Sequence, residues 1–413
     1  MEGATPSNAK SISTPRRAAA AALAVTLALQ MFTSLAATAT PVLAPMIARD
    51  LDLSPNLIGV FVGIIYAGSM AGSLAAGGFV ERFGAIRVSQ ACVVMCAVSL
   101  AAVCAGAAPP SPLVVLLALS PLLLGLGYRP ITPASSHVLI RTAPPSRMAL
   151  TFSIKQTGVP AGAALAGALL PGLALAQGWR ATYIAIAALG IGIAIAAQST
   201  RATLDADRQP GRAISFAGVF APLKVVFGTR ALAELALTGF FYAATQVCLS
   251  SFLVIYLTET LKFGIVAAGL ALTVANVGGI VGRIAWGGTA DHWVPPRVML
   301  GLIGVAAALC AYATAAFGAH WPNAIMFAVC ALFGATAIGW NGVQLAEVAR
   351  HSPAGQAGAV TGASGFVTFA GVVLGPPVFA LLAASTGSYR IGFLVFGTAS
   401  LLCGSRLLLQ RKR

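Results

Sequence analysis

Long hydrophobic stretches alternate with short polar segments along the whole chain. Each stretch has roughly twenty residues or more, which is enough for a helix to cross a hydrocarbon layer about 30 Å thick. The pattern predicts twelve membrane-spanning segments, at residues 18–47, 55–79, 88–107, 113–140, 148–176, 181–198, 231–257, 264–288, 298–318, 324–346, 357–384 and 391–409. Lipid offers the backbone no hydrogen-bond partners, and the sequence lacks the alternating ten-residue segments of a membrane β-barrel. We therefore expect an all-α membrane protein.

The first hydrophobic stretch has a second interpretation, as an export signal. Arg16 and Arg17 precede it, and residues 37–39 resemble a cleavage site. Such signals precede soluble domains, whereas eleven further hydrophobic segments follow here. We therefore interpret residues 18–47 as the first transmembrane helix and expect it to be broken near Pro41 and Pro45.

The composition agrees with a membrane protein and not with a soluble one. Of the 413 residues, 58% are hydrophobic and 8% are charged, and a soluble protein of this size could not cover so apolar a surface. The formal net charge is +15, but the basic residues are scattered over short loops, so we expect no nucleic-acid partner.

The distribution of lysine and arginine predicts the orientation of the chain. Basic loops are retained in the cytoplasm. Placing the N-terminus inside assigns eighteen basic residues to the cytoplasmic side and four, Arg49, Arg180, Lys262 and Arg390, to the outer side. We expect a multi-pass protein of the cell inner membrane with both termini in the cytoplasm, as an N-terminal tail (1–17) and a basic C-terminal tail (410–413).

A central polar segment, residues 199–230, divides the spans into two bundles of six helices, at 18–198 and 231–409. Within this cytoplasmic segment, residues 214–227 are too short to span, and we expect a short helix along the inner leaflet, interrupted at Pro222. Residues 77–87 resemble residues 287–297 (287 − 77 = 210), and Arg141 matches Arg350 (350 − 141 = 209). The two bundles are therefore predicted to be pseudo-symmetric parallel copies, an arrangement that transporters use.

Residue patterns typical of catalysis do not occur in the sequence. The seven cysteines lie within predicted spans and have no metal-ligand spacing, and there is no HExxH or GxSxG arrangement. We therefore expect neither an enzyme nor a cofactor or metal site.

The segment after the second span carries a more specific signal. With Gly77, Glu81, Arg82, Gly84 and Arg87 it resembles the loop motif Gly-x-x-x-Asp-Arg-x-Gly-x-x-Arg of the major facilitator superfamily, with Glu81 in place of the commoner Asp. A degraded second copy has Gly287 and Asp291. Residues 153–180 and 339–350 are loosely similar to the cyanate and organic-anion permease branch of this superfamily.

The resemblance implies a carrier that alternates between inward-open and outward-open states by rocking one bundle against the other. The gating residues would be Gly77, Glu81, Arg82, Gly84, Arg87, Arg283, Asp291, Glu347 and Arg350. A carboxylate near a helix N-terminus is stabilised by the helix dipole, so Glu81 could cap the eleventh span and Asp291 the fifth when the cytoplasmic side is closed. The alternative is a rigid turn with solvated charges.

Three basic residues, Arg129, Lys155 and Arg283, lie inside predicted spans. A charge at the bilayer centre costs at least ~2.5–3.5 kcal/mol, so such residues usually face a polar cavity. The predicted spans of the first bundle offer no acid to pair with Arg129 or Lys155, which favours an anionic substrate as the counter-charge. The alternatives are hydrogen bonds from Arg129 to backbone carbonyls and, for Arg283, either a gate beside Asp291 or a substrate contact.

Spans one, four, seven and ten line the cavity in the resembled family, and polar residues recur on them at helical spacing. With the two basic residues, they give the predicted substrate-binding set of Gln30, Ser34, Arg129, Lys155, Gln156, Tyr242, Gln246, Trp340, Asn341 and Gln344. Thr38 extends the stripe on the first span. We interpret His137 as interfacial rather than proton-coupling, and Glu234 as an ion-pair partner of Arg230 rather than a proton carrier.

The sequence thus predicts a secondary active transporter, with a small organic carboxylate as substrate and proton coupling or exchange as the driving force. Its expected partners are this substrate, the lipid bilayer and a coupling proton, and we expect a monomer. The alternative is a multidrug or other efflux carrier for hydrophobic or cationic compounds. Such a carrier would ordinarily need an intramembrane carboxylate, which the predicted spans do not offer near their centre.

Overall fold

The computed structural model describes residues 15–106, 114–143, 148–211, 221–318, 320–353 and 357–409, and within these ranges the regular elements are all helices. The first half contains α1 (Pro15–Asp50), α2 (Leu57–Phe83), α3 (Ala85–Gly106), α4 (Val114–Tyr128), α5 (Ile131–Thr142), α6 (Met148–Gln156), α7 (Gly158–Gln177) and α8 (Trp179–Leu204). The second half contains α9 (Ala221–Gly228), α10 (Arg230–Ile255), the π-helix η2 (Tyr256–Thr260), α11 (Ile265–His292), α12 (Pro296–Ala315), α13 (Asn323–Ala337), α14 (Asn341–His351), α15 (Ala357–Thr386) and α16 (Tyr389–Leu409).

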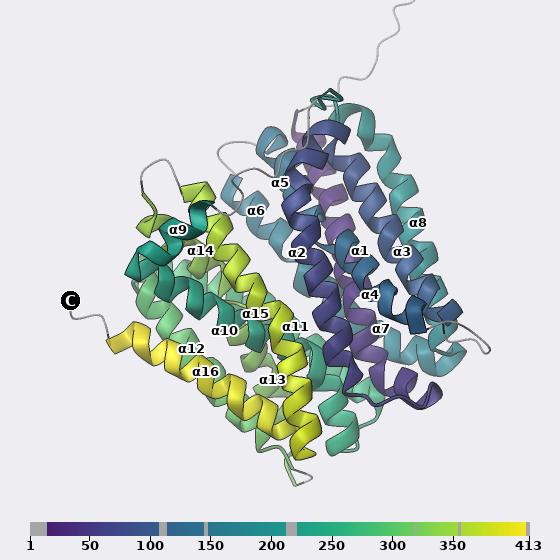
Figure 1. Ribbon diagram of the computed structural model, residues 1–413, viewed down its shortest axis with the longest axis vertical. Coiled ribbons are helices and arrows are strands. Elements are labelled where there is room, and N and C mark those ends of the chain that lie inside the picture. The colour runs from purple at the N-terminus through teal and green to yellow at the C-terminus, as the bar shows by residue number, and fades with distance from the viewer. Residues whose placement is uncertain are drawn as a thin grey trace, which may run out of the picture.

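The all-α membrane fold is confirmed. Ten helical segments in the described ranges are long and apolar enough to cross a membrane, and the bent helix α2 is an eleventh. The paired helices α4 and α5 occupy the predicted fourth span. This layout agrees with twelve helices in two bundles, and Figure 1 shows the first bundle in purple to teal and the second in green to yellow.

Three spans that the hydropathy pattern predicts as single helices are interrupted within the span. The fourth breaks between Tyr128 and Ile131, the fifth at Thr157, and the tenth between Ala337 and Asn341. Pro130 has no N–H to continue the helical ladder of α4, and it is instead the N-cap residue of α5. The first helical segments of spans four and ten end at equivalent positions of the two copies, since 337 − 128 = 209.

The first span is not broken, which corrects the prediction at Pro41 and Pro45. Helix α1 continues through both prolines to Asp50. It packs against α7, α8, α10 and α5, so the two prolines lie in a segment that other helices surround. Neighbouring helices allow a transmembrane helix to tolerate proline, because they and local adjustments satisfy the backbone groups that proline frees.

The two bundles meet mainly along two helix pairs, α7 with α11 and α2 with α15, and α1 also contacts α10. A Cβ atom added to Gly167 would lie 2.5 Å from the carbonyl oxygen of Gly269, and one added to Gly59 would lie 2.5 Å from that of Pro376. Both contacts lie towards the ends of the helices that the charge distribution assigns to the outer side of the membrane. There the guanidinium of Arg49 also pairs with Glu259 at 3.2 Å. In Figure 1 the bundles converge towards the lower end of the view and diverge towards the end at which α9 lies.

The central segment contains a short helix, as expected, and α9 packs against α10 and α15. Pro222 is the second residue of this helix and does not interrupt it. Residues 212–220, which include the start of the predicted segment, lie outside the described ranges. On the other side, α8 extends to Leu204, so the first bundle ends later than residue 198.

Candidate functional site

A polar cavity lies between the two halves, with about 170 Å³ of space open to water-sized molecules. Its wall comes from α1, α2, α7, α10, α11 and α15 and from the breaks in spans four, five and ten. Helix breaks leave backbone groups without intrahelical partners, and in membrane proteins such groups are tolerated where they line a cavity.

Arg129 lies on the break between α4 and α5, and it lines this cavity. Its guanidinium carbon is 4.1 Å from the centroid of the Phe369 ring of α15, in the other half. Among the residues that the structure describes, its side chain makes no hydrogen bond or ion pair. Two tyrosines, Tyr66 and Tyr128, line the same region, with ring centroids 6.1 Å apart. The five N–H donors of Arg129 therefore remain able to bind a ligand.

Arg283 of α11 also lines the cavity, and it links the two helix breaks that flank it. Its Nε donates to the carbonyl of Ile338, at the break of span ten, at 3.2 Å. Its Nη1 donates to the carbonyl of Gln156, at the break of span five in the opposite half, at 3.0 Å. The residue was predicted as a gate, and the structure places it in the wall of the cavity, where it bridges the halves.

Lys155 does not line the cavity but lies behind its wall. The residue is 1% exposed, and its Nζ donates to the carbonyl of Thr132 at 3.4 Å. The hydroxyl of Thr132, a lining residue, donates to Oε1 of Gln30 at 3.1 Å. Lys155 and Gln30 thus support Thr132 from behind, while Ser34 and Gln156 reach the cavity.

Of the predicted residues in the second half, some line the cavity and others lie behind its wall. Gln246 and Asn341 line the cavity, and Oε1 of Gln246 accepts hydrogen bonds from Trp340 Nε1 at 3.1 Å and from Asn341 Nδ2 at 3.2 Å. Since its carbonyl oxygen is used twice, the amide group of Gln246 is available to donate into the cavity. Trp340 is buried behind it and packs edge-on against Tyr242.

Two predicted residues bond away from the cavity. The hydroxyl of Tyr242 donates to the carbonyl of Leu300, at 2.9 Å, on α12. Nε2 of Gln344 donates to the carbonyl of Leu235, on α10, at 2.6 Å. Neither residue belongs to the cavity wall.

The charge of the cavity is positive. Arg129 and Arg283 line it, and none of the residues that line it is acidic. Sequence reasoning missed the lining residues Tyr66, Asn276 and Phe369, because it sought polar stripes on spans one, four, seven and ten and elsewhere considered mainly the basic residues. Asn276 lies seven residues before Arg283 on α11, and this helical spacing was a signal that could have found it.

The loop motif is bound to the end of α8, within the first half. Gly84 has φ +96°, and an added Cβ would overlap the carboxylate of Asp205. That carboxylate accepts hydrogen bonds from the backbone N–H groups of Ile86 at 2.8 Å and Arg87 at 3.0 Å, at the N-terminus of α3. The carbonyl of Glu81 accepts from the N–H of Gln209 at 2.7 Å. The sequence did not indicate that Asp205 holds this loop.

The other predicted gating residues are placed as follows. The guanidinium of Arg82 lies over Phe83, with its carbon 5.3 Å from the ring centroid, and Gly77 has open space around it. Glu347 is buried and pairs with Arg350 at 3.2 Å. The side chain of Asp291 lies outside the described part, so capping of spans five and eleven stays a prediction.

Two ion-pair clusters lie at the ends of the bundles that the charge distribution assigns to the cytoplasmic side. Asp207 bonds to His137 Nε2 at 2.6 Å and pairs with Arg141, which agrees with an interfacial His137. Burial raises the pKa of Asp207, but the bonds from His137 and the charge of Arg141 outweigh it, so the pKa lies below its ordinary value. Glu234 pairs with Arg230 as expected, at 3.3 Å, and additionally with Arg297 at 2.7 Å and Arg406 at 3.1 Å.

Comparison with known proteins identifies a family and a fold. A family model described as Major Facilitator Superfamily matches residues 26–376. None of the curated proteins compared with the chain matches it. Similar solved structures include a bacterial homologue of the human lysosomal transporter Spinster in an inward-facing and occupied conformation, with 17% identity, TM-score 0.70, and coverage of 96% of this chain and 97% of that chain.

Two further structures are similar over most of their length. A mutant of the nucleoside transporter NupG has 14% identity and TM-score 0.73, with coverage of 94% of this chain and 100% of that chain. A POT family transporter in complex with 5-aminolevulinic acid has 12% identity and TM-score 0.73, with coverage of 94% and 95%. At these identities the similarity concerns the fold.

Proposed function

The chain belongs to the major facilitator superfamily, and we propose that this transporter carries a small organic anion, bound through its carboxylate, across the cell inner membrane. The observation that carries the proposal is that Arg129 and Arg283 enter one cavity between the halves and that its lining residues include no acid. We propose alternating access as the mechanism, driven by proton coupling or by exchange for a second anion.

The guanidinium of Arg129 has the chemistry that a carboxylate needs. Its planar fork can donate two parallel hydrogen bonds to the two carboxylate oxygens, and it stays ionised in a membrane interior. In the described structure it contacts an aromatic face and has no acidic partner. A bound anion would supply the missing counter-charge and would also offset the repulsion between Arg129 and Arg283.

The size and the wall of the cavity favour a small substrate with an apolar body. Its 170 Å³ is below the roughly 300 Å³ at which pockets for drug-sized ligands begin. Apolar lining residues such as Val159, Ala163, Val247 and Val372 lie among the polar ones and offer contacts for an apolar body. These features, and the lack of a carboxylate in the lining, support an anion over a large cationic drug.

The contacts between the halves support a cavity that opens towards the predicted inner side of the membrane. The Gly167–Gly269 approach and the Arg49–Glu259 pair join the halves on the predicted outer side. On the predicted inner side, α5 and α6 pack against helices of the first half, and α14 packs against helices of the second. Rocking of the halves about the cavity would break the outer contacts and bring the inner ends together.

The test is ligand-dependent thermal stability, because a ligand that binds the folded state raises its apparent unfolding temperature. The purified chain would be screened against acetate, succinate, benzoate, phosphate and tetraphenylphosphonium. We expect at least one carboxylate to stabilise the wild type and to lose that effect in Arg129→Ala and in Arg283→Ala. The control is Arg390→Ala, since Arg390 is an exposed arginine that donates to the carbonyl of Phe317 at 2.8 Å and does not line the cavity.

Stabilisation by tetraphenylphosphonium and by none of the carboxylates would overturn the proposal in favour of a cation carrier. If the carboxylate stabilises both Arg129→Ala and Arg283→Ala as much as the wild type, the two arginines do not form the binding site. The coupling is then read in proteoliposomes: uptake driven by an imposed pH gradient indicates proton coupling, and uptake that requires internal anion indicates exchange.

A further inference from the structure

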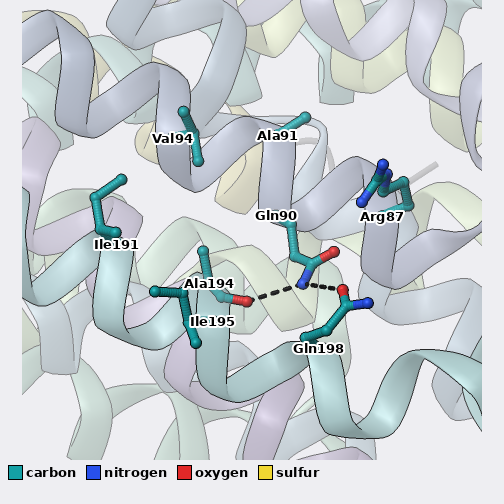
Figure 2. Close-up of a pocket in the computed structure, with 8 residues that line it drawn as sticks. All are labelled: Arg87, Gln90, Ala91, Val94, Ile191, Ala194, Ile195 and Gln198. Atoms are coloured by element: carbon teal, nitrogen blue, oxygen red, sulfur yellow. Dashed lines mark hydrogen bonds between the residues drawn. The ribbon is translucent and has the colours of Figure 1, made fainter.

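A second concave site lies on the exposed flank of the first bundle, in a groove of about 440 Å³ between α3 and α8. Figure 2 shows the residues that line it, with Val94 and Ile191 towards one end and Arg87, Gln90 and Gln198 towards the other. The apolar part is exposed, and Ile195 has 69% of its surface accessible. On a helix that spans a membrane, such a surface faces lipid.

The groove ends in polar groups that join the two helices. Nε2 of Gln90 donates to the carbonyl of Ala194 at 2.8 Å and to Oε1 of Gln198 at 3.0 Å (Figure 2). The side-chain oxygen of Gln90, Oε1, is buried and has no hydrogen-bond partner in the described structure. These side chains lie near the N-terminus of α3 and the C-terminus of α8, which the charge distribution assigns to the cytoplasmic side.

The groove continues at Gln198 into a polar pocket of about 390 Å³, which Arg201, Asp205 and Arg208 line. The carboxylate of Asp205 is already bonded to the N-terminus of α3. Nε of Arg201 has no hydrogen bond in the described structure and lies 3.9 Å from that carboxylate.

Arg87 and Arg208 are exposed at the same end. Within the ranges that the structure describes, their side chains make no hydrogen bond or ion pair. Three guanidinium groups therefore accompany one carboxylate, whose two oxygens already accept hydrogen bonds from the N-terminus of α3.

We propose that this groove and pocket bind one anionic glycerophospholipid of the inner leaflet, of the phosphatidylglycerol class. The phosphate would be held by Arg87, Arg201 and Arg208, and one acyl chain would occupy the groove over Ala91 and Ala194. The stretch from Gln198 to Ile191 is seven residues of helix, or ~10 Å, and leads from the predicted inner membrane surface into the hydrocarbon layer. Basic pockets between helices on the cytoplasmic side recognise anionic headgroups in this way.

The continuity of the two parts distinguishes a lipid from a free anion. A soluble phosphate would use the arginines and leave the groove unused. A lipid uses both, because its charge and its chain enter the site together. The site is separate from the central cavity, so this inference does not depend on the identity of the transported substrate.

The experiment compares dioleoyl phosphatidylglycerol, dioleoyl phosphatidylcholine and glycerol 3-phosphate as additives to the purified full-length chain in detergent. Binding would be read by native mass spectrometry and by the apparent unfolding temperature. We expect phosphatidylglycerol to bind at least tenfold more tightly than phosphatidylcholine and to stabilise the wild type by several degrees. Glycerol 3-phosphate should have little effect at equal concentration.

Two kinds of variant separate the headgroup from the chain. The double variant Arg201→Ala/Arg208→Ala should lose the preference for phosphatidylglycerol, whereas Lys224→Ala, an exposed cation on α9, should keep it. Ala91→Trp fills the groove without changing any charge and should lower phosphatidylglycerol binding at least fivefold. Its matched control is Val98→Trp, since Val98 is half exposed on α3 and lies outside the groove.

Each result decides the proposal. Equal binding of the two lipids, or a preference that survives both the double variant and Ala91→Trp, would overturn it. Full stabilisation by glycerol 3-phosphate, unaffected by Ala91→Trp, would also overturn it and would identify a soluble-anion site.

Discussion

The guanidinium carbon of Arg129 lies 4.1 Å from the centroid of the Phe369 ring, although the two residues belong to different halves of the molecule. Arg129 lies on the break of span four, and Phe369 lies on α15, the helix that packs against α2 across the interface. An arginine over an aromatic face gains roughly 0.5–2 kcal/mol, more when the pair is desolvated. The contact therefore both positions the proposed anion anchor and joins the halves beside the cavity.

The first prediction concerns this contact. Phe369→Leu keeps an apolar side chain but removes the π face, so Arg129 should lose its fixed position. We expect the affinity for a stabilising carboxylate to fall about 2- to 30-fold, which corresponds to the ~0.5–2 kcal/mol of the interaction. Phe369→Tyr should restore most of it. Equilibrium titration of the three proteins checks this, and equal affinity in all three would show that the ring does not position Arg129.

The fold could be predicted from the sequence because membrane insertion leaves few choices. Runs of about twenty apolar residues must be helices, and the positive-inside rule then orients them. The breaks at Arg129, Thr157 and Ile338 were not predicted, since a hydropathy pattern averages over a whole span and is unaffected by one or two residues of non-helical backbone. Pro130 was a local signal for one of them.

The cavity could be predicted only in part, for a reason that Lys155 and Tyr242 illustrate. Helical spacing identifies which residues share a face, but it does not say how deep each lies behind the wall. Lys155 is covered by Thr132, and Tyr242 turns towards α12. Arg129 was recognisable because an intramembrane guanidinium is costly unless it faces a cavity or a partner. Asp205 was not, because an acid in a loop carries no signal of the helix that it caps.

A second prediction concerns Glu234, a buried carboxylate with three arginine partners, Arg230, Arg297 and Arg406. Glu234→Gln leaves these guanidinium groups without a counter-charge, although two of them are largely exposed. We expect the free energy of unfolding to fall by about 1–3 kcal/mol.

The comparison for this prediction is Glu259→Gln, which breaks a single exposed pair with Arg49. It should cost less than about 1 kcal/mol. Apparent unfolding temperatures of both variants check the difference, and a larger loss in Glu259→Gln would contradict a stabilising role for Glu234 in its ion-pair cluster.

A third prediction concerns Gly84, whose φ of +96° places it in a region that residues with a Cβ rarely adopt. In Gly84→Ala the new methyl group would also meet the Asp205 carboxylate that caps α3. We expect a loss of roughly 1–3 kcal/mol of stability. Gly77→Ala in the same motif should be neutral or stabilising, because Gly77 is helical with open space around it. Thermal unfolding of the two alanine variants distinguishes a strained cap from a general sensitivity of the motif.

A fourth prediction follows from the lowered pKa of Asp207, whose carboxylate bonds to His137 and pairs with Arg141. A carboxyl with a depressed folded-state pKa contributes stability above its unfolded pKa of about 3.9, and this contribution is lost as the pH falls through the folded value. Asp207→Asn should therefore be less stable than the wild type at pH 7, by no more than about 1 kcal/mol because the pair is partly exposed. The gap should shrink below about pH 4.

The measurement for Asp207 is the apparent unfolding temperature of both proteins from pH 7 down to pH 3.5. Asp52→Asn, at an exposed aspartate between α1 and α2, serves as the control and should show no such gap. A gap between wild type and Asp207→Asn that stays constant across this range would mean that the ionised carboxylate is not what stabilises the contact.

The last prediction tests alternating access at a close approach of the two halves, between Gly167 of α7 and Gly269 of α11. A Cβ at either position would overlap the backbone of the other helix, so Gly269→Ala should oppose the state in which the outer ends are in contact. Overpacking costs about 1–3 kcal/mol, which corresponds to a population shift of roughly 5- to 150-fold towards the outward-open state. A cysteine introduced at Ser250, in the cavity wall, should then react faster with a membrane-impermeant maleimide added from outside. Gly172→Ala, on the facing helix α7, has open space and should leave the labelling rate unchanged. If Gly269→Ala labels at the wild-type rate while the protein remains folded, the glycine contact does not govern opening of the outer side.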